Sequence, residues 1–163
     1  MAQQKVTPSG WEQWTPEKRA TLIFIFHDEE ILLIEKKRGL GEGKINGPGG
    51  KLEAGETFEQ AAVRETLEEV GLHVTQLEIA GELHFQMSDS ADMTCLVYRT
   101  VHFSGDLTET DEAAPFWCSV DAIPYDQMWE DDREWFPYLL NGQYFRGFYR
   151  FEGDRMKEAN LLV

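Results

Sequence analysis

Three glutamates within five residues are the part of this sequence best suited to chemistry. On a helix at about 100° per residue, Glu65, Glu68 and Glu69 fall within one arc of roughly 100°. Like charges at this spacing repel by a few tenths of a kcal/mol per pair, and a bound divalent cation would reverse that cost. Oxygen ligands without histidine or cysteine favour Mg²⁺ or Mn²⁺. The alternative is an acidic helix face that only meets water.

The helix that carries these glutamates is the clearest element of the chain. Residues 57–70 contain neither glycine nor proline, Thr57 and Gln60 form a capping box, and Gly71 provides the C-terminal stop. We expect the helix to direct the glutamates outward and to bury its opposite side. The residues on that buried side are Val63, Thr66, Leu67 and Val70.

Two neighbouring features support a ligand role for the glutamates. Arg64 is adjacent in sequence and can orient one carboxylate, as groups outside the ligand set commonly do at metal sites. The glycine-rich turn at residues 47–50 lies just upstream, and its exposed backbone carbonyls could supply one more oxygen. The sequence therefore predicts a cation site between this turn and the helix.

The composition limits what such a site could serve. The chain has 163 residues, of which 42% are hydrophobic and 12% aromatic, and this predicts one folded domain. The 30 acidic and 15 basic side chains give a net charge of -15, which repels a nucleic-acid backbone. We therefore expect no nucleic-acid polymer as partner. A small phosphorylated substrate would need cations to bridge it to this protein.

The remaining composition favours an intracellular protein. Cys95 and Cys118 are the only cysteines, so we expect two reduced thiols and no cysteine-based zinc site. The first 20 residues have no apolar stretch, and no run approaches the roughly 20 apolar residues of a membrane span. We expect no signal peptide, no membrane contact, a cytoplasmic location and a monomer.

The pattern along the chain predicts an α/β domain. Residues 1–18 read as an extension, wrapped on the surface or partly disordered, and residues 19–163 as the domain. A glycine-dense loop is expected over residues 38–55. The expected strands are residues 21–26, 31–37, 74–85, 94–103, 116–120 and 144–151, with breaks or loops at Gly81, 88–92 and 105–114. A second helix over about residues 132–140 would begin with Asp131 and Glu134 as a capping box.

The glutamate helix and the turn before it match a known sequence pattern. The pattern G-x5-E-x7-R-E-U-x-E-E-x-G-U is met at every fixed position, with Thr66 in place of the usual bulky aliphatic residue. The chain is therefore identified as resembling the Nudix hydrolase family. The residues that carry the match are Gly50, Glu56, Arg64, Glu65, Glu68, Glu69, Gly71 and Leu72.

The resemblance implies a fold, a reaction and a set of roles. It implies an α/β/α sandwich around a curved mixed sheet, and metal-dependent hydrolysis of a nucleoside diphosphate linked to another group. Glu65, Glu68 and Glu69 with the Gly50 carbonyl would hold Mg²⁺ or Mn²⁺, and Glu112 in the loop at 108–114 would add a further acid. The general base stays open among Glu65, Glu69 and Glu112. Arg64 and Glu56 would act as supports, or would be ordinary helix charges.

Within the family, the chain resembles one branch over about residues 19–153, the oxidised purine nucleoside triphosphate diphosphatases. The likeness is carried by residues 36–39, 46–47, 49–51, 128–132 and 135–137. Leu40, Ile45 and Met87 depart from the branch's aromatic choices. The implied substrate-binding residues are Thr21, Lys36, Leu40, Asn46, Phe85, Met87, Met93, Trp129, Asp131 and Asp132.

The expected chemistry of this pocket suits a purine. Trp129 can stack on the base, while Asn46 and the two aspartates offer donors and acceptors to its edge. Two adjacent carboxylates in an apolar pocket should not both ionise, so one is expected to keep a proton. The alternatives are that Asp131 only caps the following helix and that Trp129 and Met87 only pack in the core.

The branch resemblance implies hydrolysis of nucleotides of the 8-oxo-dGTP and 2-oxo-dATP type to a monophosphate and pyrophosphate, which would sanitise the nucleotide pool. Two alternatives are a Nudix hydrolase of a nucleotide sugar or dinucleoside polyphosphate, and a nucleotide sensor without turnover. Trp129 with Asp131 and Asp132 favours the first function over another substrate. The complete set of helix glutamates with Arg64 argues against a sensor.

Overall fold

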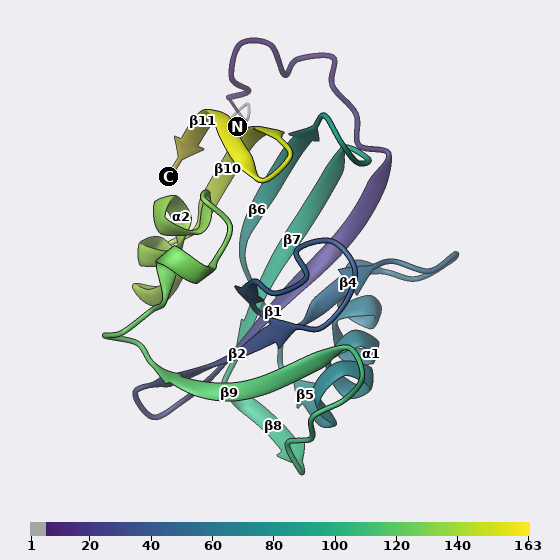
Figure 1. Ribbon diagram of the computed structural model, residues 1–163, viewed down its shortest axis with the longest axis vertical. Helices are drawn as coiled ribbons and strands as arrows, with labels where there is room; N and C mark the ends of the chain where they lie inside the picture. Colours follow the sequence, from purple (N-terminus) through teal and green to yellow (C-terminus); the bar gives the residue numbers. More distant parts are fainter. Residues whose placement is uncertain (1–5) are drawn as a thin grey trace, which may run out of the picture.

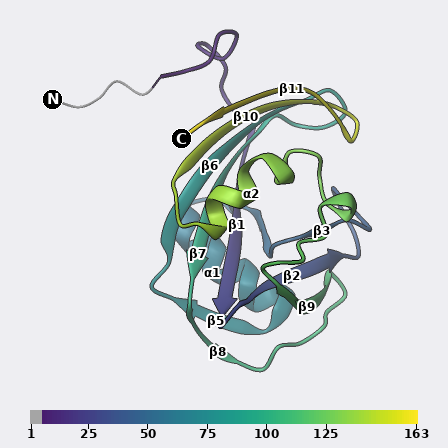
Figure 2. The ribbon, with the colours of Figure 1, turned by 90° about the vertical axis from the view of Figure 1, so that its left-hand side faces the viewer.

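The computed structural model describes residues 6–163, so the first five residues of the predicted extension lie outside it. A large mixed sheet carries one helix on each face (Figure 1, Figure 2). The strands are β1 (Lys18–His27), β2 (Glu30–Lys36), β3 (Ile45–Asn46), β4 (Gly49–Lys51), β5 (Leu72–Thr75), β6 (Glu78–Met87), β7 (Met93–Thr100), β8 (His102–Gly105), β9 (Ala113–Ser119), β10 (Phe145–Glu152) and β11 (Arg155–Leu162). The helices are α1 (Phe58–Val70), the short 3-10 turn η1 (Tyr125–Gln127) and α2 (Asp132–Leu140).

The sheet has the order β11-β10-β6-β7-β1-β2-β3, with β4 paired to β1 and β9 paired to β2. The pairs β1–β7 and β6–β10 are parallel and the other pairs are antiparallel, while β5 and β8 form a separate ribbon. The sheet curves around α2 on one face and α1 covers β1 from the other (Figure 2). The expected α/β/α sandwich is confirmed.

Helix α1 begins and ends as its sequence predicts. Thr57 and Gln60 exchange both hydrogen bonds of a capping box, and Gly71 takes the left-handed conformation at the C-terminus, with φ of 77°. Thr66 is buried and its hydroxyl donates to the Ala62 carbonyl at 2.7 Å. The helix therefore accommodates threonine at this buried position, where the family pattern has a bulky aliphatic residue.

The predicted buried face of α1 is right for Thr66 and Val70 and wrong for Leu67, because the face is shifted towards Glu69. Leu67 is 52% exposed, whereas Glu69 is only 6% exposed. The helix rests on β1, β4, β5 and β9 through the side that includes Ala61, Ala62 and Val70. Because β4 begins with two glycines, the helix approaches this turn closely on its glutamate side. Glu69 therefore points into the protein, and the three glutamates do not all point outward as predicted.

Long-range strand pairing decided several element boundaries. The glycine-dense loop contains two short strands, β3 and β4, which exist because β2 and β1 pair with them. Gly81 lies inside β6 and does not break the strand, although the pairing with β7 shifts register between Ile79 and Gly81. A Cβ at Gly81 would lie 2.4 Å from the ring of Phe145, so the glycine lets this ring pack against the strand. The chain breaks instead at Gln76, which has a positive φ of 53°, and between β7 and β8. The polar strand β11 was not predicted.

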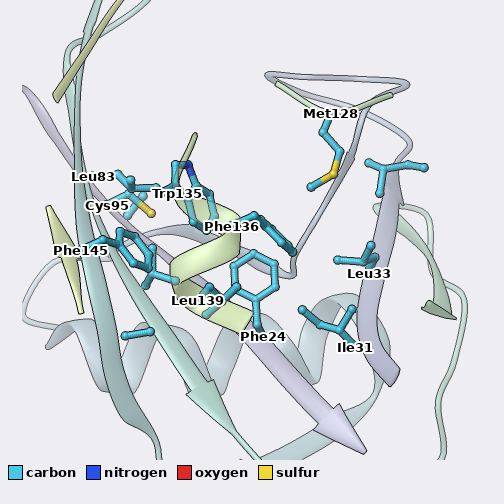
Figure 3. Close-up of a cluster of buried hydrophobic side chains, with 14 of the residues drawn as sticks. Phe24, Ile31, Leu33, Leu83, Cys95, Met128, Trp135, Phe136, Leu139 and Phe145 are labelled. Carbon is cyan, nitrogen blue, oxygen red and sulfur yellow. The ribbon is translucent and has the colours of Figure 1, made fainter. Parts of the chain in front are cut away.

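Helix α2 closes the apolar core over the sheet (Figure 3). Trp135, Phe136 and Leu139 are fully buried against residues such as Phe24 and Phe145, and the Trp135 ring stacks on Phe145 with centroids 5.2 Å apart. The predicted capping box at the start of α2 is wrong, because the Asp131 side chain makes no capping bond. Its carboxylate is turned into the protein instead.

Residues 6–17 lie on the face of the sheet opposite α2, with Trp11 only 4% exposed. The expected wrapping of the extension on the surface is thus seen for its described part. Both cysteines are free. Among residues 6–163, no helix combines the length and apolar character required to cross a membrane.

The orientation of α1 predicts a contrast between two substitutions of similar size. Val70→Ala should lower the free energy of unfolding by about 2 kcal/mol, because it opens a cavity in a fully buried site. Leu67→Ala should change it by less than about 0.5 kcal/mol, since this side chain is mainly exposed. Urea unfolding of both variants measures the difference. Equal losses would contradict the observed rotation of the helix.

Candidate active site

Three carboxylates converge in a cleft beside the glycine turn. Glu65 and Glu69 come from α1, and Glu112 comes from the loop that precedes β9. Within residues 6–163, one oxygen from each of these three side chains lies within 4.8 Å of the other two. Lys36 and Arg38 also line the cleft. This arrangement brings together predicted residues that lie more than 40 positions apart in the sequence.

The electrostatics of the cleft favour a bound cation. Burial, followed by the nearby charge of Glu65, raises the pKa of Glu69 to about 8. Burial also raises the pKa of Glu65, although its hydrogen bond from Arg64 opposes the shift. Ionising both groups together is therefore costly unless a positive charge lies between them. A divalent cation would provide that charge, and the oxygen-only donor set suits Mg²⁺ or Mn²⁺.

The absence of a side chain at Gly50 shapes this cleft. A Cβ at this position would lie 2.6 Å from Oε1 of Glu65, so only glycine lets the carboxylate approach the turn. The neighbouring Gly49 N–H points at Oε2 of Glu69 at 3.4 Å. The residues present thus fit a cation, and the predicted role of the Gly50 carbonyl as a ligand stays a prediction.

Arg64 connects the cleft to the start of α1. Its Nε and Nη2 donate to both oxygens of Glu56, at 2.6 and 2.8 Å, and its Nη1 donates to Glu65 at 2.9 Å. The fork to Glu56 holds the guanidinium in place and lowers the pKa of Glu56 to about 2. These contacts support the predicted positioning role, because they fix one face of the Glu65 carboxylate.

Glu68 lies apart from the three converging acids. Its side chain is 51% exposed and accepts a hydrogen bond from Arg64 Nη1 at 3.2 Å. The sequence pattern predicts the same role for all three helix glutamates, but the orientation of α1 on the sheet places Glu68 towards solvent. Its role as a ligand stays a prediction.

A cavity of about 340 Å³ opens next to this cleft, between the sheet and the start of α2. It shares Lys36, Gly49 and Gly50 with the acidic cleft, so the two spaces lie side by side. All ten residues expected to bind substrate line it: Thr21, Lys36, Leu40, Asn46, Phe85, Met87, Met93, Trp129, Asp131 and Asp132.

Asp131 and Asp132 are buried carboxylates that line this cavity. Asp131 Oδ2 accepts from Trp135 Nε1 at 2.8 Å, and Asp132 Oδ2 accepts from the Trp129 backbone N–H at 3.2 Å. Burial raises the pKa of Asp131 to about 6. Burial, and then the charge of Asp131, raises the pKa of Asp132 well above its ordinary value. The pair can therefore present one proton donor and one acceptor near neutral pH.

Trp129 stands at the edge of the cavity with three neighbours. Its ring meets Phe151 edge-on at 5.5 Å, and Lys44 Nζ lies 5.2 Å from its centroid. A Cβ on Gly41 would lie 2.8 Å from Trp129 Nε1, so the glycine-dense loop passes directly beside the indole. These contacts hold the ring in one orientation, which suits a stacking surface.

The sequence did not identify Phe151, Lys44 and Cys95, although Phe151 and Cys95 line the cavity and Lys44 lies against Trp129. Phe151 could have been found from the alternation of Phe145, Tyr149 and Phe151, which places all three on one face of β10. No signal in the sequence marked Cys95.

The comparisons with known proteins agree with this geometry. A model of the NUDIX domain matches residues 16–139. The chain belongs to the NUDIX family. It is 43% identical over 137 residues to a protein of Danio rerio named oxidized purine nucleoside triphosphate hydrolase, covering 83% of this chain and 88% of the relative. It is 41% identical over 133 residues to the protein of that name in Mus musculus, covering 81% and 85%.

Solved structures of bacterial MutT proteins share the fold. The MutT protein of Bacillus halodurans matches with a TM-score of 0.79 at 22% identity, covering 88% of this chain and 97% of that one. A MutT NUDIX hydrolase of Burkholderia pseudomallei matches with a TM-score of 0.61 at 29% identity, covering 66% and 86%. The family predicted from the spacing of the glutamates is thereby confirmed.

The Glu56–Arg64 pair predicts a pH-dependent loss of stability. Because the folded pKa of Glu56, about 2, lies below its ordinary value of 4.5, its ionised form stabilises the fold above about pH 4.5, and this contribution disappears as the pH falls towards 2. Glu56→Gln should therefore lower Tm at pH 7 but have little effect on Tm at pH 2 and below. The control is Glu59→Gln, which removes the charge of an exposed glutamate in the first turn of α1. A Tm difference independent of pH would contradict the assignment.

Proposed function

We propose that the protein hydrolyses oxidised purine nucleoside triphosphates, of the 8-oxo-dGTP and 2-oxo-dATP type, to a monophosphate and pyrophosphate, and so sanitises the nucleotide pool. The observation that carries this proposal is the buried Asp131–Asp132 pair in a cavity that lies beside the cleft of three carboxylates and shares lining residues with it. The names of the zebrafish and mouse relatives point to the same substrates.

In this proposal the acidic cleft handles the phosphates. Glu65, Glu69 and Glu112 would hold the cation, and Arg64 would keep Glu65 in position through its fork to Glu56. When bound, Mg²⁺ neutralises the phosphate charge and lowers the pKa of the attacking water. One of the three carboxylates accepts the proton of that water. Lys36, which borders both spaces, offers a positive charge where the phosphates enter the cleft.

The cavity recognises the base. Trp129 offers a stacking surface, and Phe85, Met87 and Met93 supply apolar walls. Asn46 Oδ1 accepts from the Gly47 N–H at 2.8 Å, which fixes its amide and leaves its NH₂ group to donate to the purine. A proton on either aspartate changes which atoms at the edge of the purine can form hydrogen bonds with the pair. One cavity could thus bind more than one oxidised purine.

We also propose that Mg²⁺ is the natural cation and that the protein acts as a cytoplasmic monomer. Sedimentation at working concentrations tests the monomer, and the activities with Mg²⁺ and Mn²⁺ at cellular levels test the cation.

A panel of oxidised and unmodified nucleotides, with identification of the products, tests the proposed reaction. We expect a monophosphate and pyrophosphate, with oxidised purine triphosphates preferred. Preference for a nucleotide sugar or a dinucleoside polyphosphate would identify a different substrate class. Nucleotide binding without turnover would identify a sensor, and inorganic phosphate as the first product would contradict the cleavage site.

Activity should require the divalent cation and its carboxylates. Removal of the cation with EDTA should abolish turnover, and Glu69→Gln should lower kcat by more than about 100-fold, beyond the loss typical of outer groups at metal sites. We expect a large loss for Glu68→Gln as well. Glu59→Gln, on the exposed first turn of α1, is the matched control. Wild-type turnover by Glu69→Gln would contradict the cation site, whereas wild-type turnover by Glu68→Gln alone would remove Glu68 from it.

The aspartates should set the choice of base without stabilising the fold. Asp131→Asn and Asp132→Asn fix the donors and acceptor of the side chain, so each should change the ratio of kcat/KM for 8-oxo-dGTP and 2-oxo-dATP. Because burial raises the pKa of Asp132, its ionisation near neutral pH destabilises the fold, and Asp132→Asn should keep or raise Tm.

Trp129→Ala provides an independent measurement at the same cavity. Loss of the stacking surface should cost about 1 to 3 kcal/mol, by analogy with aromatic stacking on bases, and should mainly lower kcat/KM for purines. An unchanged substrate ratio in both aspartate variants, with normal activity of Trp129→Ala, would remove the oxidised purine assignment.

A further inference from the structure

Asp92 links the N-terminal segment to the wall of the base cavity. Its Oδ1 accepts from the Met87 backbone N–H at 2.9 Å, and its Oδ2 accepts from Trp14 Nε1 at 2.8 Å. Its backbone carbonyl accepts from the N–H groups of Glu17 and Lys18, both at 3.0 Å. One residue therefore joins the end of β6 to the segment that precedes β1.

That segment, residues 6–17, is here called the strap, and it is anchored on the sheet face opposite the cavity. Trp11 packs edge-on against Phe148 of β10 and against Trp14, with ring centroids 5.3 and 5.0 Å apart. Arg146 of β10 donates to the Val6 carbonyl at 2.6 Å. The strap leaves these contacts and enters β1 at the end of the sheet where β6 turns into β7 (Figure 1).

The groups held by Asp92 form part of the cavity. Met87, whose backbone N–H binds Asp92, is the last residue of β6, and Met93, which follows Asp92, is the first residue of β7. Both line the cavity. The ends of strands next to a turn are among the parts of a sheet that open most easily. Asp92 accepts hydrogen bonds with both carboxylate oxygens and with its backbone carbonyl. These bonds fix the two methionines relative to the rest of the cavity.

We propose that the strap and Asp92 determine base specificity by positioning Met87 and Met93 against the purine. The inference rests on the proposed function, because it assumes that this cavity holds the base. Trp14 and Asp92 are positioning residues, since they act through the methionines. The three carboxylates of the cleft belong to α1 and to the loop before β9, so the strap should affect base binding much more than the chemical step.

The test compares two tryptophans of the strap. Trp14→Phe keeps an aromatic ring but removes the N–H that binds Asp92, whereas Trp11→Phe makes the same change without touching that bond. We expect Trp14→Phe to raise KM for an oxidised purine triphosphate by about three- to tenfold, the range expected for loss of a hydrogen bond to a charged group that acts indirectly, with kcat within about twofold. Trp11→Phe should leave KM nearly unchanged at a similar loss of Tm.

A double-mutant cycle identifies the bond itself. Asp92→Asn replaces one of the two accepting oxygens with an NH₂ group, so only one of the two donors keeps an acceptor. This variant should therefore weaken discrimination between oxidised and unmodified purine triphosphates, as Trp14→Phe does. The variant carrying both changes should be no worse than Asp92→Asn alone. Additive effects, or equal KM values in Trp14→Phe and Trp11→Phe, would overturn the inference.

Amide hydrogen exchange gives a readout that needs no substrate. Exchange over residues 86–93 should accelerate at least about tenfold in Trp14→Phe relative to Trp11→Phe, because the Met87 N–H loses a fixed acceptor. Unchanged exchange there would overturn the inference even if oxidised purines are the substrates. A third outcome is faster exchange in Trp14→Phe together with a wild type that does not prefer oxidised purines. This outcome would contradict the proposed function, but the strap would still be the element that fixes this wall of the cavity.

Discussion

Burial of carboxylates is the constraint on which the rest of the structure depends. Glu65 and Glu69 lie in the cleft and Asp131 and Asp132 lie in the adjoining cavity, in a chain whose net charge is already -15. Removing such groups from water raises their pKa values and costs stability unless each charge is neutralised. The charges can be neutralised differently in the two spaces. A cation suits the carboxylates of the cleft, whereas a proton suits the aspartate pair of the cavity.

The glycine turn before α1 allows the acidic cleft and the base cavity to lie side by side. Gly49 packs against β1 so closely that a Cβ would lie 2.0 Å from the Thr21 carbonyl, and Gly50 gives way to the Glu65 carboxylate. Both glycines border the cavity and the cleft. A substrate with a base at one end and phosphates at the other could therefore span the turn with its charge at the cation site and its base beside the aspartates.

The curved sheet holds the parts of the site that come from distant segments. Its concave face carries Phe85, Met93 and Phe151 from three strands, and α2 places Asp132 over them. The opposite face is covered by α1 at one end and by residues 6–17 at the other. The cavity wall therefore depends on packing from behind the sheet as well as on its own lining residues.

The sequence by itself determined the features that depend on neighbours along the chain. The caps of α1 are local, and so is the spacing of Arg64 and the glutamates, which identified the family before any geometry was known. The ten cavity residues were also predicted, through resemblance to relatives that place them in one pocket. Sequence spacing alone could not have brought Thr21, Phe85 and Trp129 together.

Only the tertiary structure decided which side of each element is buried. The angular position of Glu69 on α1 is fixed by sequence, but its burial follows from the close approach of a helix to two glycines. Gly81 continues β6 because β7 and β10 pair with it on either side. The strand β11 forms as a hairpin on the edge of β10. Asp131 turns inward to Trp135, four residues on, and does not cap α2. In these cases strand pairing or burial outweighs the local preference expressed by a turn or cap signal.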